Sequence, residues 1–189
     1  MDERPHVPDT AAGLARACIV YGAPSIMNQT SAHGLSRQIP GIVPATDMAV
    51  VRILFEEYSK GLGFSLCFQN FDQELAELPG RYAPPMGGLW LAWVGEMAAG
   101  CVALRPLENG LCEMKRLYVR PAHAGHGLGR ALAETAVAGA RERGFAAIRL
   151  DTLESMTAAN ALYQKLGFGR IDPYCLTPLD GALHYELAL

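Results

Sequence analysis

The residues of this sequence that most directly suggest chemistry are three glycines, Gly125, Gly127 and Gly129, spaced two positions apart. They follow an apolar, strand-like run over 111–119 and precede a stretch of helical periodicity that ends near residue 143. The first N–H groups of a helix have no partner inside it, and the helix dipole favours negative charge beside them. Because glycine has no Cβ, phosphate oxygens can approach such a backbone closely. The pattern therefore predicts an anion site that suits a phosphate group.

Two well-known phosphate-binding patterns do not fit residues 124–130. The P-loop pattern G-x-x-x-x-G-K-[ST] is absent, and the dinucleotide pattern G-x-G-x-x-G fails because Arg130 occupies its third glycine position. What remains is G-x-G-x-G at the start of a helix, with Arg130 in the first turn. The alternative is that the glycines only permit a tight connection between strand and helix.

Three segments resemble a known family. GHGLGRALAETAVAGARERGF (125–145), RLDTL (149–153) and ALYQKLGF (161–168) are similar to the GNAT superfamily of acetyl-CoA-dependent N-acetyltransferases, and in particular to a bacterial-type branch of small enzymes. The similarity covers residues 41–189. It implies an α/β (α+β) fold with a mixed, mostly antiparallel central sheet flanked by helices, in which the fourth and fifth strands splay apart.

The same resemblance implies acetyl-CoA as the co-substrate and no metal. The family's loop pattern begins at Ala124, where the family has Gln or Arg, so one side-chain donor is missing here. By the resemblance, the backbone of Leu117 and Val119 would pair with the pantetheine arm. The loop that would bind the pyrophosphate comprises Ala124, Gly125, His126, Gly127, Leu128, Gly129 and Arg130.

Amide formation needs a neutral amine, while an alkylammonium is mostly protonated near neutral pH. A carboxylate in the cleft can accept that proton. The resemblance points to Glu113, eleven residues before Ala124, which is the offset of the catalytic glutamate in several GNAT enzymes. The alternative is a structural glutamate that is solvated or paired with Lys115 or Arg116.

Tyr163 matches the tyrosine with which many GNAT enzymes protonate the departing CoA thiolate. Its alternative role is to pack its helix onto the sheet. The family often has Asn seven positions earlier, where this chain has Met156, and Asn160 lies nearby at a different helical phase. One contact to CoA is therefore in doubt.

Other reactive side chains fit structural roles better. His123 and His126 lie in a glycine loop without an evident third ligand, so we expect exposed loop histidines rather than a metal site. Cys112 is expected to be a small buried strand residue rather than a nucleophile. Four basic residues, Lys115, Arg116, Arg120 and Arg130, are expected to surround the phosphate site.

The hydrophobic pattern predicts the elements that position these residues. The resemblance implies a bulge in the strand over 111–119, and the spacing of Met114, Leu117 and Val119 agrees, because these residues can share one face only with a bulge. Helices are expected after Asp47, over 69–79, from the glycine loop to 143, and over 156–166; strands are expected at 42–43, 89–94, 97–104, 111–119, 146–150, 168–175 and 183–188.

Composition narrows the functional class. The 189 residues are 50% hydrophobic, enough for one core, and 16 Lys+Arg against 19 Asp+Glu argue against nucleic-acid binding. No apolar run approaches the ~20 residues of a membrane helix. The acidic, proline-containing start does not resemble a secretory signal. The five cysteines have neither metal nor redox spacing. We expect a cytoplasmic protein that is a monomer or a homodimer.

Residues 1–40 are predicted to be a partly irregular N-terminal extension, with a helix from Thr10 to Val20 as one option, and 41–189 the GNAT domain. The expected reaction is direct acetyl transfer, in a ternary complex, to a primary amine of a small molecule. A non-catalytic acyl-CoA sensor and a protein or peptide N-acetyltransferase stay open. The acceptor could lie against an apolar wall formed by four aromatic residues, Phe64, Phe68, Phe71 and Tyr82. The alternative is that these residues only pack helices onto the sheet.

Overall fold

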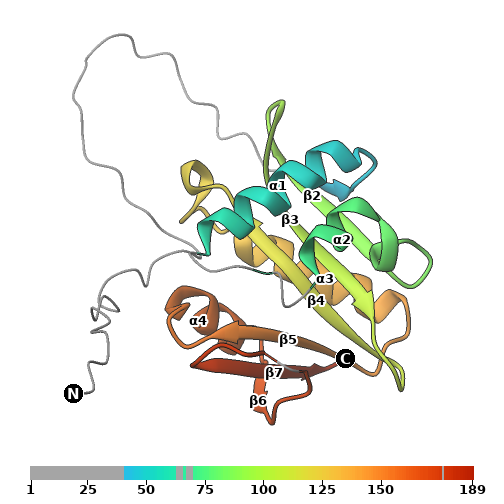
Figure 1. The fold of residues 1–189 in the computed structure, drawn as a ribbon, viewed down its shortest axis with the longest axis vertical. Helices are drawn as coiled ribbons and strands as arrows, with labels where there is room; N and C mark the ends of the chain where they lie inside the picture. The colour runs from blue at the N-terminus through green and yellow to red at the C-terminus, as the bar shows by residue number, and fades with distance from the viewer. Residues whose placement is uncertain (1–40, 63–65, 67–69, 176) are drawn as a thin grey trace, which may run out of the picture.

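The computed structural model describes residues 41–62, 66, 70–175 and 177–189, which form one sheet with helices on both faces (Figure 1). The seven strands lie in the order β1-β2-β3-β4-β5-β7-β6, and every neighbouring pair is antiparallel except β4–β5. The strands are β1 (Gly41–Pro44), β2 (Gly88–Val94), β3 (Met97–Pro106), β4 (Leu111–Val119), β5 (Ala147–Leu153), β6 (Gly169–Ile171) and β7 (Ala182–Ala188). The helices are α1 (Met48–Gly61), α2 (Phe71–Ala76), α3 (Leu128–Glu142) and α4 (Thr157–Lys165), with 3-10 turns η2 (Gly80–Tyr82) and η3 (Pro121–His123). The predicted fold class is confirmed.

Local sequence signals account for most element boundaries. The Asp47 carboxylate caps α1 by accepting the N–H groups of Ala49 and Val50 at 2.9 and 3.3 Å. Two predicted elements are shorter than expected. Helix α2 ends at Ala76 instead of 79, because a residue before proline disfavours the helical conformation and Pro79 follows. Strand β6 ends at Ile171 because Pro173 cannot donate to a sheet, so Tyr174 lies in the loop before β7.

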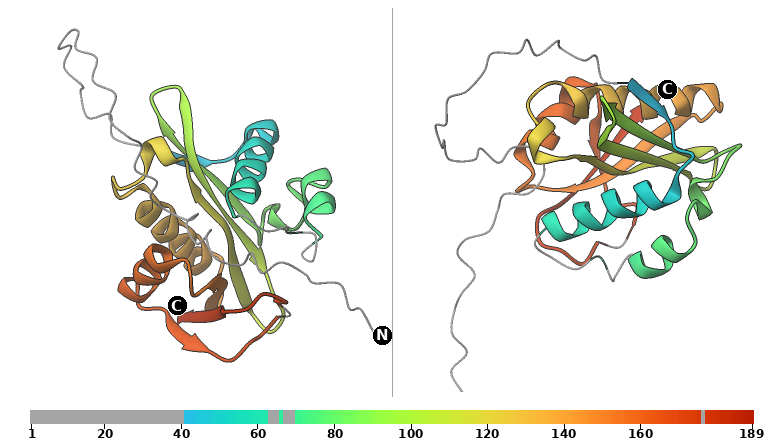
Figure 2. Two further views of the ribbon diagram at one scale, coloured as in Figure 1. Left: turned by 60° about the vertical axis from the view of Figure 1, so that its left-hand side comes forward. Right: turned by 90° about the horizontal axis from the view of Figure 1, so that it is seen from above.

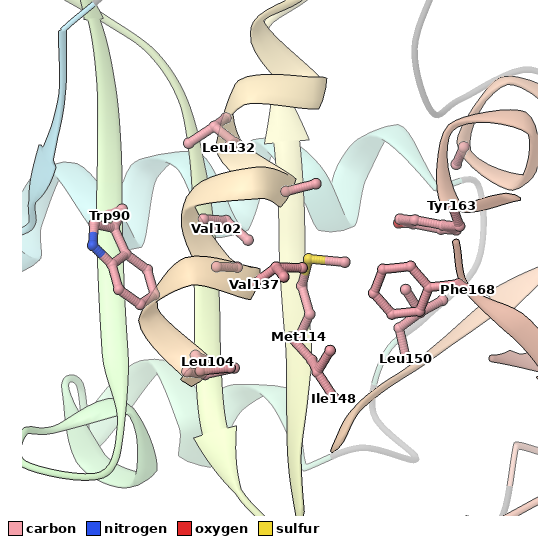
Figure 3. Close-up of a cluster of buried hydrophobic side chains, with 14 of the residues drawn as sticks. Trp90, Val102, Leu104, Met114, Leu132, Val137, Ile148, Leu150, Tyr163 and Phe168 are labelled. Carbon is pink, nitrogen blue, oxygen red and sulfur yellow. The ribbon is translucent and has the colours of Figure 1, made fainter. Parts of the chain in front are cut away.

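The two faces of the sheet bury separate cores. Helices α3 and α4 cover one face, and α1 and α2 cover the other (Figure 2). The core beneath α3 contains Val102, Met114 and Leu132, and it extends to Tyr163 and Phe168 (Figure 3). No helix in the described part of the chain is long and apolar enough to cross a bilayer.

Strand β4 carries the predicted bulge. Lys115 pairs with Ala103 and Tyr118 with Cys101, so Arg116 and Leu117 together oppose one residue of β3. Arg116 has a φ of +56° at this point. The extra residue brings Met114, Leu117 and Val119 onto the α3 side, as the prediction required.

Strands β4 and β5 pair over three residues only, from Leu111↔Ala147 to Glu113↔Arg149. Beyond Glu113 the two strands diverge, and none of the described strands pairs with residues 114–119 of β4 on that side. The predicted splay is therefore present. It leaves a wedge between β4 and β5 with backbone N–H and C=O groups along its rim.

Candidate functional site

The glycine loop lies between the end of β4 and α3. Gly125 and Gly127 have φ values of +79° and +83°, and Gly127 is the N-cap of α3. A Cβ at either position would meet no atom within 4 Å, so the left-handed backbone, rather than crowding, calls for glycine here. Gly127 supplies no side-chain cap, and the N–H of Ala131 is the one that bonds to its carbonyl. The preceding N–H groups of the first turn therefore suit an anion.

The basic residues expected around this loop mostly lie elsewhere. Lys115, Arg116 and Arg120 pair with Asp151 on β5, Glu74 on α2 and Glu57 on α1, at 3.0, 2.5 and 2.8 Å. Arg130 does lie in the first turn of α3, half exposed, with its Nε 2.8 Å from Glu134. The prediction of a four-residue basic cluster is wrong, because carboxylates on three other elements hold three of its members. The groups that the loop offers to an anion are therefore mainly backbone N–H groups.

Cys112 and His126 have the burial that was expected, whereas His123 is less exposed than expected. His126 is exposed and His123 half-buried, and the described residues contain no group of three or more side chains that could hold a metal ion. Cys112 is fully buried, and burial raises the pKa of its thiol to about 12. A thiol in that state is a poor nucleophile.

Glu113 is the last β4 residue that pairs with β5, and its side chain is fully buried. Its Oε2 accepts a hydrogen bond from Arg105 Nε at 2.6 Å, and its Oε1 accepts one from the Tyr174 hydroxyl at 2.8 Å. Lys115 Nζ lies 3.8 Å from Oε1. Burial and the charge of Glu113 raise the pKa of Tyr174, so its hydroxyl keeps the proton that it donates. Glu113 is thus a paired carboxylate, held by Arg105 and Tyr174 with Lys115 nearby.

An ion pair crosses the wedge two residues beyond Glu113 on β4. Lys115 Nζ on β4 lies 3.0 Å from Asp151 Oδ1 on β5, and both side chains are nearly buried. Burial raises the pKa of Asp151, but the charge and hydrogen bond of Lys115 outweigh it, so the pKa lies below its usual value. The pair holds the two strands together at the point where their backbone pairing stops.

Tyr163 lies on the opposite side of the sheet from Glu113. It belongs to the core beneath α3, with its ring 5.9 Å from that of Phe168 and 6.3 Å from that of Tyr185 (Figure 3). Glu113 points to the other face, since its neighbours Cys112 and Met114 belong to this core. A molecule that touches both Glu113 and Tyr163 must therefore pass through the wedge.

The start of α4 holds a buried polar atom without a partner. Asn160 Nδ2 donates to the carbonyl of Leu153 at 2.9 Å, whereas its Oδ1 is buried and has no hydrogen-bond donor among the described residues. Met156, at the position where the family often has Asn, accepts a weak bond from the Thr152 hydroxyl at 3.4 Å. The Asn160 side chain thus binds the backbone segment that precedes α4.

The proposed aromatic wall is only partly visible. Phe64 and Phe68 lie outside the described residues, and Phe71 and Tyr82 are buried in the core beneath α1 and α2. The Tyr82 hydroxyl donates to Glu74 at 2.7 Å. Beside them, a hollow of about 180 Å³ is lined by α2, η2 and Arg105 of β3.

Sequence reasoning named Lys115 beside Glu113 but missed its two hydrogen-bond partners, Arg105 and Tyr174. One signal for Arg105 was available, because Arg105 and Glu113 stand four residues to either side of Asn109 in the Asn109-Gly110 turn. A hairpin about that turn places the two opposite charges across from each other, as the register confirms. Tyr174 and Asp151 had no such signal, since their approach depends on how β6, β7 and the wedge are arranged.

Comparison with known proteins agrees with this geometry. The acetyltransferase (GNAT) family matches residues 50–168. An N-acetyltransferase from Schizosaccharomyces pombe is 37% identical over 145 residues, which cover 76% of this chain and 89% of that protein. A GNAT-family acetyltransferase structure from Staphylococcus aureus superposes with a TM-score of 0.67 at 18% identity, over 79% of this chain and 99% of that one.

A second structure shares the fold with a ligand present. A proposed acetyltransferase from Salmonella typhimurium, determined with its cofactor acetyl-CoA, superposes with a TM-score of 0.62 at 21% identity, over 79% of this chain and 93% of that one. The family match covers well over half of the chain, and the fold, the bulge in β4 and the wedge agree with it. This chain belongs to the acetyltransferase (GNAT) family of acyl-transferring enzymes.

Proposed function

We propose that this enzyme transfers an acetyl group from acetyl-CoA to a primary amine of a small molecule, by direct attack in a ternary complex. The observation that carries the proposal is the wedge between β4 and β5, which begins directly after Glu113 and leads to the glycine loop. One end of the wedge offers a buried carboxylate, and the other offers a helix N-terminus without a side-chain cap.

The wedge suits the cofactor because its rim consists of unpaired backbone. An extended pantetheine arm can bond to the backbone of Leu117 and Val119 as an added strand would. The pyrophosphate would then rest on the backbone from Gly125 to Arg130. The Salmonella typhimurium neighbour, determined with acetyl-CoA, supports this choice of cofactor.

The chemistry needs one proton acceptor and one proton donor. The neutral amine attacks the thioester carbonyl carbon, the new C–N bond forms, the C–S bond breaks, and the electron pair leaves on the CoA sulfur. The amine or a water first displaces the Tyr174 hydroxyl from Oε1 of Glu113. Glu113 then accepts the amine proton at that oxygen, directly or through the water. Tyr163 protonates the thiolate from the other side of the wedge.

The test is the release of free CoA thiol from acetyl-CoA by the full chain, across a panel of small amines. The expected result is amine-dependent thiol release that Glu113→Gln and Tyr163→Phe both lower. Binding of acetyl-CoA without turnover on any small amine would refute the proposal in favour of a sensor. Turnover on peptide amines alone would refute the small-molecule acceptor.

A further inference from the structure

We infer that the acceptor carries a carboxylate next to its amine, as an amino acid does, and that Arg105 binds this carboxylate. The inference rests on the proposed function, because it concerns the acceptor of the same reaction. Arg105 lies on β3 directly opposite Glu113, and about a quarter of its side chain (23%) is exposed. It therefore touches both the proposed base and the space in front of it.

The hydrogen bonds of Arg105 leave most of its donors unused. A guanidinium has five N–H donors in a planar fork that matches the two oxygens of a carboxylate. Arg105 gives its Nε–H to Glu113 Oε2. Its two terminal amino groups have no hydrogen-bond acceptor in the described part of the chain. Unpaired donors at a partly buried site favour a ligand that supplies acceptors.

The hollow of about 180 Å³ contains the open side of Arg105. Its wall also contains two carboxylates, but each already has a donor. Glu74 accepts from Arg116 and from the Tyr82 hydroxyl, and Glu77 accepts from Gln73 at 2.7 Å. The wall also contains a second cation, the exposed Arg81. Arg105 is the partly buried cation of this wall, and its terminal donors have no acceptor among the described residues, so the ligand that suits it is an anion.

Position then restricts where the amine can be. A carboxylate on the terminal nitrogens of Arg105 lies one guanidinium width from Glu113, because the Nε of the same side chain is 2.6 Å from Glu113 Oε2. In an α-amino acid the amine is two bonds from the carboxylate carbon. An acceptor anchored in this way brings its amine beside the carboxylate that deprotonates it, next to the start of the wedge. An amine acceptor that lacks a carboxylate would leave the terminal donors of Arg105 without a ligand acceptor.

The experiment compares matched acceptors on the full chain. Each of a set of α-amino acids is paired with its own α-amide, which keeps the side chain and the amine but removes the negative charge. The expected kcat/KM of the wild-type enzyme is at least about tenfold higher for the best amino acid than for its amide, as expected for a charge-assisted hydrogen bond of roughly 1.5 kcal/mol. The α-amide has the less basic amine, so a larger fraction of it is neutral and able to attack at a given pH. This difference favours the amide and therefore works against the expected result.

Arg105→Gln should reduce that ratio to about one. The readout is the ratio of kcat/KM for the amino acid to kcat/KM for its amide, measured within one variant. Both acceptors use Glu113, so any damage to this base lowers both values and leaves their ratio unchanged. Arg170→Gln, at an exposed position on β6, is the matched control and should keep the wild-type ratio. An unchanged dissociation constant for acetyl-CoA establishes that each variant is folded.

The outcomes separate the two claims. Equal kcat/KM for amino acids and amides in the wild type, or a ratio that Arg105→Gln leaves unchanged, overturns the role of Arg105 while the proposed function stands. No thiol release with any amine overturns the proposed function and the inference with it.

Discussion

The glycine loop and the polar network around Glu113 are the two halves of the proposed site, and they are built in opposite ways. The loop is mostly exposed, is contiguous in sequence over 124–130, and offers backbone N–H groups. The network is buried, and its side chains come from β3, β4, β5 and the loop before β7. Backbone donors recognise a phosphate common to many ligands, whereas side chains gathered from distant segments can differ from one relative to the next.

This contrast predicts which half controls which kinetic constant. Changes in the loop should alter the affinity for acetyl-CoA and leave the chemical step of the saturated enzyme nearly intact. Changes in the network should do the reverse. The first three variants below can contradict this division between acetyl-CoA affinity and the rate of the chemical step.

The largest effect is expected from Glu113→Gln. The amide keeps the size of the side chain but cannot accept the amine proton, so kcat should fall about 100-fold, the size typical of a lost general base. Steady-state thiol release at saturating acetyl-CoA measures it. Glu186→Gln, in the ion pair with Arg149 on β5, is the matched control and should stay near wild type. A kcat for Glu113→Gln equal to wild type would show that the buried carboxylate has only a structural role.

The next effect is expected from Gly127→Val. A β-branched residue is strained at a φ of +83°, so the N-terminus of α3 should distort and the dissociation constant of acetyl-CoA should rise about tenfold or more. Isothermal titration calorimetry measures it. Gly144→Val is the control, because Gly144 follows the C-terminal end of the same helix with a φ of +74°. The control should lose stability with unchanged acetyl-CoA affinity, and equal losses of affinity in both variants would contradict a specific role for the loop.

A smaller effect is expected from Tyr163→Phe. The ring packing against Phe168 and Tyr185 is kept, while the donor for the CoA thiolate is lost, so kcat should fall roughly tenfold at constant acetyl-CoA affinity. Tyr185→Phe, in the same aromatic cluster, is the control and should not change kcat. If both variants matched wild type in kcat but lost stability, Tyr163 would be a packing residue.

The smallest effect concerns pH and stability. The pKa values of Asp151 and Glu74 lie below their usual values, because the ion pairs with Lys115 and Arg116 outweigh the opposing effect of burial. Carboxylates of this kind stabilise the fold above their unfolded pKa of about 4, and this stability is lost as the pH falls toward the folded pKa. The free energy of unfolding in urea should therefore decrease below about pH 5.

Asp151→Asn should flatten that decrease, since one of the titrating groups is gone. The variant should be less stable than wild type at pH 7, and the two curves should converge in acid. Asp72→Asn, at an exposed position of α2, should run parallel to wild type. A slope that Asp151→Asn leaves unchanged would mean that Asp151 keeps its ordinary pKa in the folded protein.

The sequence was sufficient to predict most of the fold and only part of the site. Strand 111–119 was predicted with its observed bounds, and its bulge was expected from the family resemblance, with which the spacing of Met114, Leu117 and Val119 agrees. Asp47 and the Asn109-Gly110 turn are similarly local signals. Local signals work because the dihedral angles and caps involved depend on adjacent residues.

The polar network could not be predicted in this way. Lys115 lies on the same strand as Glu113 and Arg105 lies across one hairpin, but Tyr174 and Asp151 reach the network only after the strands β5 to β7 are in place. The roles of Glu113 and Tyr163 come from family resemblance, and the structure adds their burial and partners without testing those roles. The basic cluster failed for the same reason, because acidic residues far away in sequence hold its members.

The wedge has a further consequence for how the chain avoids misassembly. A sheet normally has two open edges, here β1 and β6, but the divergence of β4 from β5 creates two more rims inside the molecule. Unpaired strand backbone is a template on which a second chain can add a strand and begin to aggregate. An inward-pointing lysine discourages such addition, and Lys115, tied to Asp151 across the mouth of the wedge, is in that position. The ion pair therefore lies where a charge can oppose the addition of a strand to the open part of the sheet.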